Sequence, residues 1–443
     1  MSLIIIFVIS FLGILLGKFL FKHWFNHLTL YCFIFGGSIF LYEMKLLPYV
    51  DIIPFTWFII ISAFLSFLMG ILTIIAARNL YREKPTHIEH SDIMLTIFSD
   101  DGKVLKYSIL FFSFISLYAA VEFWMVLIRQ FGSIPAVFLN AQVIYRLNIS
   151  GKLSGTTPYI YLVGYVAVFL AGIYTAYKGK FTLLAFIPIF SLILRDLAGS
   201  GRAGMLFALM EFIFTIILFR YLLNKDRLRR FKFSKLSIII VSAILLGLFI
   251  ASASLVKVSR GVVKAENYSG ASRELRQTRD NLILSPSLYL YLSSDVGVLS
   301  KYFSSDGEDT PFGQNTFMTA YLFLSKFNIV ERPHEFQKGY FIPMWTNTGT
   351  YIRELHADFG MLGVLLGPFL LGLLMTWFWF KFFENHSLIA LAFLVYLNII
   401  VGFSFFVMAT RVIYWSTSLL MLILFLPILQ KLAVYNKRKS IDF

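Results

Sequence analysis

The 443-residue sequence is poor in cysteine and in charged residues, and both shortages narrow its class. Its single cysteine, Cys32, excludes an intramolecular disulfide and argues against a cysteine-based metal site. Only 14% of the residues are charged, whereas a soluble domain has about 25%. A phosphate-binding loop, an HExxH zinc motif and a nucleophile elbow are also missing from the sequence. Because 58% of the residues are hydrophobic, we expect an integral membrane protein.

Long uncharged stretches are the dominant pattern, and they predict an all-α polytopic fold with about eleven transmembrane helices. A helix needs about 20 apolar residues to cross roughly 30 Å of hydrocarbon, and no alternating strand pattern competes with this interpretation. The predicted spans cover residues 2–21, 24–42, 54–77, 107–128, 158–177, 181–197, 203–223, 236–257, 358–380, 387–409 and 412–431. The first span lacks a preceding basic segment and a cleavage site, so we interpret it as a retained helix. We expect residues 1–443 to form a single integral membrane domain.

Basic residues collect in four places that such a topology puts on one side of the membrane. These are the connections 78–106 and 224–235, the turn 178–180 and the C-terminal tail. Because lysine and arginine retain connections in the cytoplasm, we predict a cytoplasmic C-terminus and, with an odd number of spans, an N-terminus outside. The net charge of +15 therefore reflects membrane anchoring, and we expect no nucleic-acid partner.

Two long connections then lie outside, at 129–157 and 258–357. The first contains a helix-like apolar pattern at 135–148, and the second contains the amphipathic stretch 287–303 and the aromatic-rich stretch 312–327. Their aromatic content argues against disorder. We expect short helices that cover the membrane surface like a lid.

Arginines gather on this outer side in two groups, although basic residues usually stay in the cytoplasm. Arg195 and Arg202 flank a glycine-rich turn that opens a helix, where free amides and two guanidinium groups suit a diphosphate. In the alternative interpretation, Arg195 pairs with Asp196 or extends to lipid headgroups. For the second group we predict a second polyanionic substrate, or else a solvated or headgroup-binding face. The second group consists of Arg260, Arg273, Arg276 and Arg279.

A third polar group occupies the segment 345–363, where the large outer connection enters a span. Hydroxyl, amide and aromatic groups suit a sugar, and a carboxylate or imidazole can accept a hydroxyl proton. Asp358 is the favoured proton acceptor and His356 the second choice; helix-dipole matching and a headgroup contact are the respective alternatives. The substrate-binding candidates here are Asn347, Tyr351 and Arg353, to which Arg411 adds a phosphate contact.

The Gly-Ser-Gly-Arg202 turn, the stretch Asn347–Tyr351 and the downstream Asp358-Phe-Gly-Met-Leu-Gly363 carry a family resemblance. Together with the hydropathy of nearly the whole chain, they resemble the Wzy-type O-antigen or capsular polysaccharide polymerases, also called oligosaccharide repeat unit polymerases. The resemblance implies a GT-C-like fold in the bacterial inner membrane. It implies transfer of a growing glycan from one undecaprenyl diphosphate onto a repeat unit carried by another. The lipid diphosphate already activates the sugar, so no metal or cofactor is expected.

The resemblance also implies partners: the lipid-linked donor and acceptor, membrane lipid and a chain-length regulator. An O-antigen ligase remains open because of His356. A lipid-linked oligosaccharide flippase is a further alternative, although its basic residues should line a central cavity. A membrane acyltransferase is disfavoured because no His-Asp acyl-transfer motif lies within a span.

Overall fold

The chain divides into two compact units, each built from several stretches of the sequence. The computed structural model describes residues 3–80, 94, 96–149, 152–153, 155, 157, 159–199, 201–225, 247, 272–273, 286–305, 307–308, 310–334, 337–343 and 345–439. The first unit comprises Met1–Glu83, Val263–Trp377 and Leu397–Ser416, and the second comprises Lys84–Val262, Phe378–Tyr396 and Thr417–Phe443. By these bounds, the helices α15, α16 and α17 contribute residues to both units.

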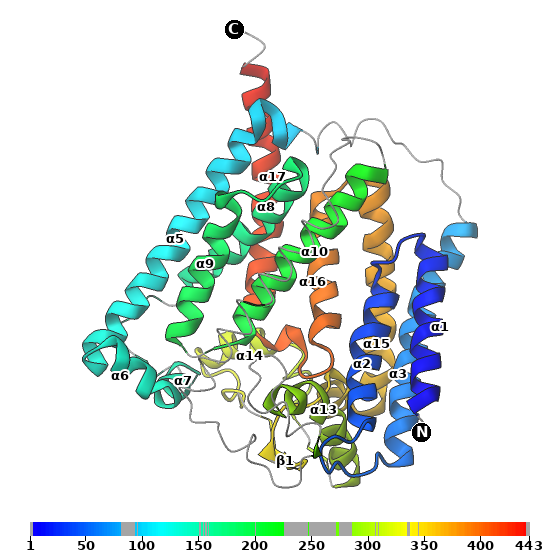
Figure 1. Ribbon diagram of the computed structural model, residues 1–443. Helices are drawn as coiled ribbons and strands as arrows, with labels where there is room; N and C mark the ends of the chain where they lie inside the picture. The colour runs from blue at the N-terminus through cyan, green and yellow to red at the C-terminus, as the bar shows by residue number, and fades with distance from the viewer. Residues whose placement is uncertain are drawn as a thin grey trace. The chain divides into compact units, whose positions relative to one another are not determined.

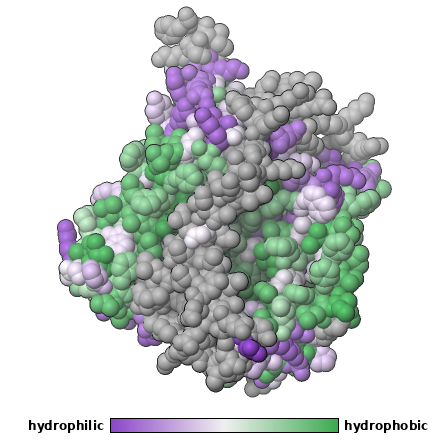
Figure 2. All heavy atoms as spheres, viewed as in Figure 1, coloured by the Kyte–Doolittle hydropathy of each residue, from purple (hydrophilic) through white to green (hydrophobic). Residues whose placement is uncertain are grey.

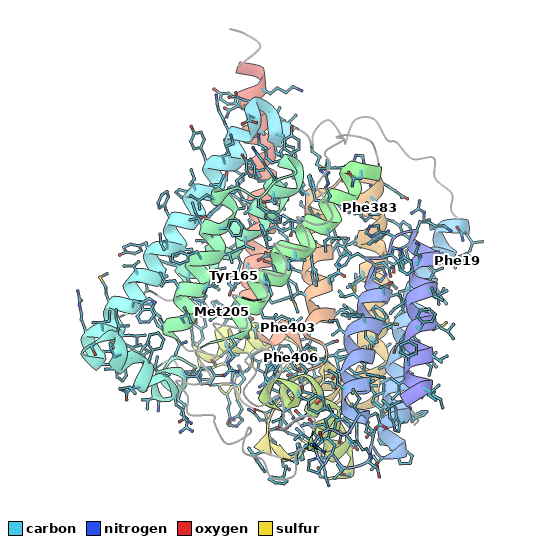
Figure 3. The ribbon with its side chains drawn as sticks, in the orientation of Figure 1. Phe19, Tyr165, Met205, Phe383, Phe403 and Phe406 are labelled. Carbon is cyan, nitrogen blue, oxygen red and sulfur yellow. The ribbon has the colours of Figure 1, made fainter. Side chains whose placement is uncertain are left out.

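The first unit combines long apolar helices with the short elements of the segment that precedes α15 (Figure 1). Its elements are α1 (Leu3–Phe21), α2 (His27–Glu43), α3 (Pro54–Leu80), α13 (Pro286–Ser304), α14 (Met318–Ser325), β1 (Tyr340–Phe341), β2 (Trp345–Thr346), most of α15 (Tyr351–Asn385), the end of α16 (Leu388–Phe403) and η3 (Ala409–Arg411). The two strands pair antiparallel, with Tyr340 opposite Thr346. After α16 the chain turns tightly, and the rings of Phe403 and Phe406 lie 4.9 Å apart in this turn (Figure 3).

Glycines set the packing of α3 against α15. A side chain at Gly70 would collide with the backbone of α15 at Phe369, and one at Gly372 would collide with the backbone of α3 at Phe67. The two backbones therefore approach more closely than any larger residue permits, which is how membrane helices associate when no hydrophobic effect drives them together. Further along the chain, α15 begins at Tyr351 rather than at the predicted 358, and it bends at Gly360, whose positive φ of 61° favours glycine.

The second unit is a bundle around α8. Its described elements are η1 (Thr96–Phe98), α5 (Ser99–Phe131), α6 (Ile134–Leu139), α7 (Ala141–Ile149), η2 (Ile160–Leu162), α8 (Val163–Lys178), α9 (Leu183–Ala198), α10 (Ala203–Lys225), the end of α15, the start of α16 and most of α17 (Ile413–Lys439). All residues from Gly164 to Thr175 are buried, because α5, α9 and α10 pack around this helix. Tyr165 of α8 points toward α10, where its ring lies 5.1 Å from that of Phe207 (Figure 3).

The fold is that of an all-α polytopic membrane protein. Among the described residues, seven helices are long and apolar enough to cross a membrane. Figure 2 shows hydrophobic side chains over α1 and α5, whose outward faces expose residues such as Phe11 and Phe114. Such faces are costly in water and are expected where lipid is the solvent.

Most predicted elements are confirmed. Ten of the predicted spans coincide with helices, and the range 236–257 lies, except for residue 247, outside the described residues. The count of eleven spans therefore stays a prediction. The amphipathic stretch 287–303 forms α13, the stretch 135–148 forms α6 and α7, and the aromatic-rich stretch contains α14.

Candidate functional site

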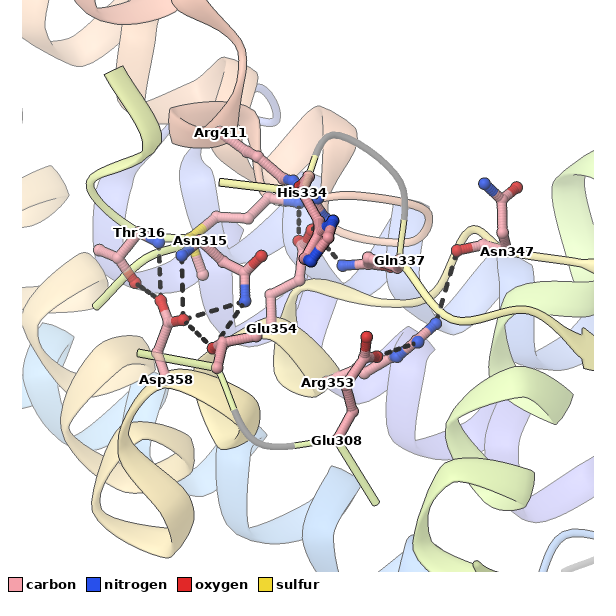
Figure 4. A network of polar contacts seen from close by, with 12 residues as sticks. Glu308, Asn315, Thr316, His334, Gln337, Asn347, Arg353, Glu354, Asp358 and Arg411 are labelled. Carbon is pink, nitrogen blue, oxygen red and sulfur yellow. Dashed lines mark hydrogen bonds and ion pairs between the residues drawn. The ribbon is translucent and has the colours of Figure 1, made fainter. Parts of the chain in front are cut away.

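A buried network of charged side chains surrounds the first turns of α15 in the first unit. At its centre is Glu354, whose side chain is fully buried. Arg411 donates from Nη1 to Glu354 Oε1 across 3.0 Å, Gln337 donates from its amide, and the backbone N–H of Met408 donates to Oε2 (Figure 4). Arg411 also donates to the carbonyl of His334 across 2.9 Å. The pair therefore fixes the turn after α16 and the segment before β1 to the start of α15.

Arg353 lies next to Glu354 but serves a different set of acceptors. Its Nη2 lies 2.7 Å from Glu308 Oε2 and 2.7 Å from the carbonyl of Lys338, and its Nη1 contacts the carbonyl of Asn347 at 3.5 Å. The rings of Tyr302 and Tyr340 pack near the guanidinium, at 5.6 and 5.2 Å. The Arg353 side chain is only 1% exposed, and its guanidinium contacts the protein itself.

Asp358 anchors the turn that precedes α14. Its Oδ1 accepts from the Thr310 hydroxyl and from both the backbone and the amide of Asn315, at 2.7–2.9 Å. Its Oδ2 accepts from the backbone and the hydroxyl of Thr316, at 2.7 and 2.8 Å (Figure 4). Because five donors bind this one buried carboxylate, Asp358 stabilises the turn before α14. Its predicted role as proton acceptor stays a prediction.

The other predicted residues on this stretch have different surroundings. His356 is half-buried, and its Nδ1 lies 2.9 Å from the Tyr302 hydroxyl. Tyr351 is buried, and its hydroxyl lies 3.0 Å from that of Tyr31, which places it in the core of the unit. The amide of Asn347 points away from the charged network (Figure 4).

Asp295 of α13 is a polar residue that the sequence analysis missed. It is fully buried, and neither carboxyl oxygen makes a hydrogen bond of good geometry to the described residues. Burial raises the pKa of Asp295 to about 8, and the Thr348 hydroxyl and the positive charge of Arg353 oppose the rise. In the sequence, Asp295 stands out as one acidic residue within an apolar stretch. The sequence did not predict which residues of this helix are buried.

The second unit holds the predicted arginine turn between α9 and α10. The guanidinium carbon of Arg195 lies 3.6 Å from the centre of the Tyr161 ring, and Nη1 lies 3.3 Å from Asp196 Oδ1. The pairing with Asp196 that the sequence left open is thus present. The Arg195 side chain keeps 15% of its surface exposed. Arg202 is half-buried just before α10, and a side chain at Gly204 would collide with the Asp196 carboxylate.

The remaining predicted residues divide by their place in the chain. Arg260, Arg276 and Arg279 lie outside the described residues. Arg273 is described and exposed, next to Ser272, whose backbone N–H bonds to the carbonyl of Leu46 at 2.9 Å. In the described part of the chain no three histidine, cysteine or acidic side chains come together as a metal site would need.

Comparisons with known proteins add no family to this geometry. The chain matches no protein-family model, no curated protein and no solved structure.

Proposed function

We propose that this chain polymerises lipid-linked oligosaccharide repeat units, transferring a growing glycan from one undecaprenyl diphosphate onto a repeat unit carried by another. The observation that carries the proposal is the arginine turn between α9 and α10. The Arg195 guanidinium carbon lies 3.6 Å from the centre of the Tyr161 ring, and Arg202 follows the turn, where the next helix begins. An arginine that is already oriented loses little conformational freedom when it binds phosphate oxygens.

The proposal includes a topology. The chain has eleven spans in a GT-C-like arrangement in a bacterial inner membrane, with the N-terminus outside and the C-terminus in the cytoplasm. The segment 258–357 then faces outward, where both lipid-linked substrates lie. Its support is the agreement of the basic connections with the positive-inside rule. A cysteine introduced at the exposed Ser305, in a Cys32→Ser background, should react with an impermeant thiol reagent in intact spheroplasts; labelling only after lysis would reverse the topology.

In the proposed reaction, a hydroxyl of the acceptor sugar attacks the anomeric carbon of the donor, and the lipid diphosphate leaves. The new glycosidic bond replaces the bond between that carbon and the phosphate oxygen, with inversion. Arg195 and Arg202 stabilise the charge on the leaving diphosphate without a metal. The acceptor hydroxyl loses its proton to a base, and the first unit, taken by itself, offers His356 and Asp358 as candidates. Of these two, His356 is the better candidate, because Asp358 already accepts five hydrogen bonds.

The test is a purified, reconstituted enzyme supplied with defined lipid-linked repeat units. Arg202→Ala should retain insertion and lose rate, because one charge-assisted contact in a transition state contributes about 2–4 kcal/mol, or ~30- to 1000-fold. Arg202→Lys should restore part of the rate, since charge returns without the planar fork. Full activity of Arg202→Ala at equal protein level would remove this turn from the site.

A deletion strain distinguishes the alternatives. Loss of a polymerase leaves single repeat units on the core without a long ladder. Loss of a ligase or of a flippase leaves core without repeats, and either result would replace the proposal. Binding of a chain-length regulator should change the distribution of ladder lengths without removing the ladder.

A further inference from the structure

The helices α6 and α7 form a hairpin in the second unit that the proposed reaction does not use. One side of this α6–α7 hairpin is fixed to the end of α5. Val137 and Ile144 are buried in one cluster with Phe123 and Leu127 of α5. The ring of Trp124 lies 5.7 Å from that of Phe138 in α6. The position of the hairpin along the membrane normal is therefore set by the last turns of α5.

The α6–α7 hairpin also exposes large apolar side chains. Ile134 is 52% exposed, Leu139 83% and Val143 50%. The basic residues Arg129 and Arg146 are exposed beside this stretch of the chain. Apolar side chains exposed next to basic ones are the pattern of a helix that lies in a membrane interface.

The exposed face of α5 locates that interface. α5 is one of the helices long and apolar enough to cross a membrane. Its exposed side chains recur every three or four residues and so form one lipid-facing stripe. They are Phe111, Phe114, Tyr118, Val121 and Met125. The next position in this spacing is the exposed Arg129, so the stripe changes from apolar to basic where hydrocarbon gives way to headgroups. The hairpin begins directly after that point.

The charge of this region has one sign. The sequence contains no acidic residue between positions 123 and 195, while Arg129, Arg146 and Lys152 are exposed. The nearest carboxylate before it, that of Glu122, accepts the hydroxyl of Thr157 at 2.8 Å and its backbone N–H at 3.3 Å. The surface is therefore complementary to anionic headgroups.

We propose that the α6–α7 hairpin lies in the headgroup layer of the bilayer, with Leu139 and Val143 inserted toward the acyl chains and Arg129 and Arg146 bound to anionic phospholipid. The proposal is independent of the reaction proposed above. It makes the hairpin a fixed point at the membrane surface for the end of α5.

Nitroxide labels test the depth. In a Cys32→Ser background, the full-length protein carries one label at Leu139→Cys or Val143→Cys and is reconstituted in vesicles containing phosphatidylglycerol. Phe114→Cys is the acyl-chain control and Lys103→Cys the aqueous control. Both hairpin labels should be more accessible to oxygen than to a water-soluble nickel complex, at a depth of about 5–10 Å. Nickel accessibility equal to that at Lys103 for both labels would overturn the proposal.

A second measurement tests the charge. The Leu139 label should lie deeper in phosphatidylglycerol vesicles than in vesicles of phosphatidylcholine alone. The double variant Arg129→Gln/Arg146→Gln should lose this difference, and Arg129→Lys/Arg146→Lys should keep it. A depth that does not depend on lipid charge in the unchanged protein would refute the binding of anionic headgroups.

Discussion

The variant Asp295→Asn should be more stable than the unchanged protein at pH 8–9 and should lose that advantage near pH 4. Asparagine has nearly the same shape as aspartic acid but cannot ionise. The Asp295 side chain is fully buried without a hydrogen bond of good geometry among the described residues, and its pKa is raised to about 8 from an ordinary value of 3.8. Burial therefore disfavours the ionised form in the folded protein.

The sign follows from proton binding. Below pH 4 the carboxyl is protonated in both the folded and the unfolded chain, so it contributes no pH dependence. Between about pH 4 and pH 8 the unfolded chain releases the proton while the folded chain retains it, so stability falls as pH rises. Above pH 8 the carboxyl is ionised in both the folded and the unfolded chain, and the loss of stability has reached its full value. At about 1.4 kcal/mol per pKa unit, the raised pKa corresponds to up to about 6 kcal/mol.

The assay is thermal unfolding in detergent at a series of pH values, with tryptophan fluorescence as the readout. The quantity of interest is the difference in Tm between Asp295→Asn and the unchanged protein, because other titrating groups cancel in it. This difference should grow by several degrees between pH 4.5 and 8.5 and then level off. Asp51→Asn is the control, since Asp51 is an exposed carboxylate in the same unit that pairs with Lys45. A difference for Asp295→Asn that does not change with pH would refute the reasoning.

Four further variants test the packing and the roles of the α15 network. Arg411→Ala should lower the free energy of unfolding by about 3–5 kcal/mol, measured by thermal or denaturant unfolding, because it leaves the buried Glu354 carboxylate without its partner charge. Gly70→Leu should lower it by about 1–3 kcal/mol or prevent folding, because its side chain meets the backbone of α15. Asp358→Asn should lower Tm, since each lost charge-assisted bond contributes about 1.5–3 kcal/mol, whereas His356→Ala should keep Tm and lose turnover.

Matched variants separate these effects from general damage. Gly37→Leu introduces the same side chain into α2 where nothing lies within 4 Å, so it should be tolerated. The double variant Arg411→Met/Glu354→Leu removes both buried charges and should recover much of the stability that Arg411→Ala loses. If Asp358→Asn folds normally and loses turnover while His356→Ala stays active, Asp358 takes over the role of proton acceptor.

The helices were predictable because their signal is local. An uncharged run of sufficient length specifies a membrane helix regardless of its neighbours, and the periodic patterns of α13, α6 and α7 are equally local. The bend of α15 was harder to predict from the sequence. Gly360 and Gly363 were visible in the sequence, but only the positive φ at Gly360 shows which of them interrupts the helix.

The partners of the charged side chains were not predictable, because they come from distant parts of the chain. Glu354 meets an arginine 57 positions later, and Asp358 meets donors 42 to 48 positions earlier. No spacing rule connects such residues, since the path of the intervening loop decides which side chains meet. The sequence therefore identified Arg353, Asp358 and Arg411 as unusual without revealing that each is engaged by the protein. Asp295 escaped because its surroundings, rather than its type, distinguish it.

Engagement within the protein changes which arginines are best suited to hold a substrate. A guanidinium that already donates to buried acceptors must break those bonds before it binds a phosphate, and each buried acceptor left unpaired costs about 1–3 kcal/mol. Arg411 is in this position, since it holds the buried Glu354, and Arg353, itself buried, holds the half-buried Glu308. Arg195 also pairs with a buried carboxylate, that of Asp196, but at 3.3 Å this contact is longer than the pairs of Arg353 and Arg411 at 2.7 and 3.0 Å. Its guanidinium also lies over the Tyr161 ring, which can remain in contact while the fork binds an anion. Arg195→Lys should therefore reduce turnover with little change in Tm, whereas Arg353→Lys should reduce both, and measuring the two quantities on the same preparations separates a binding arginine from a structural one.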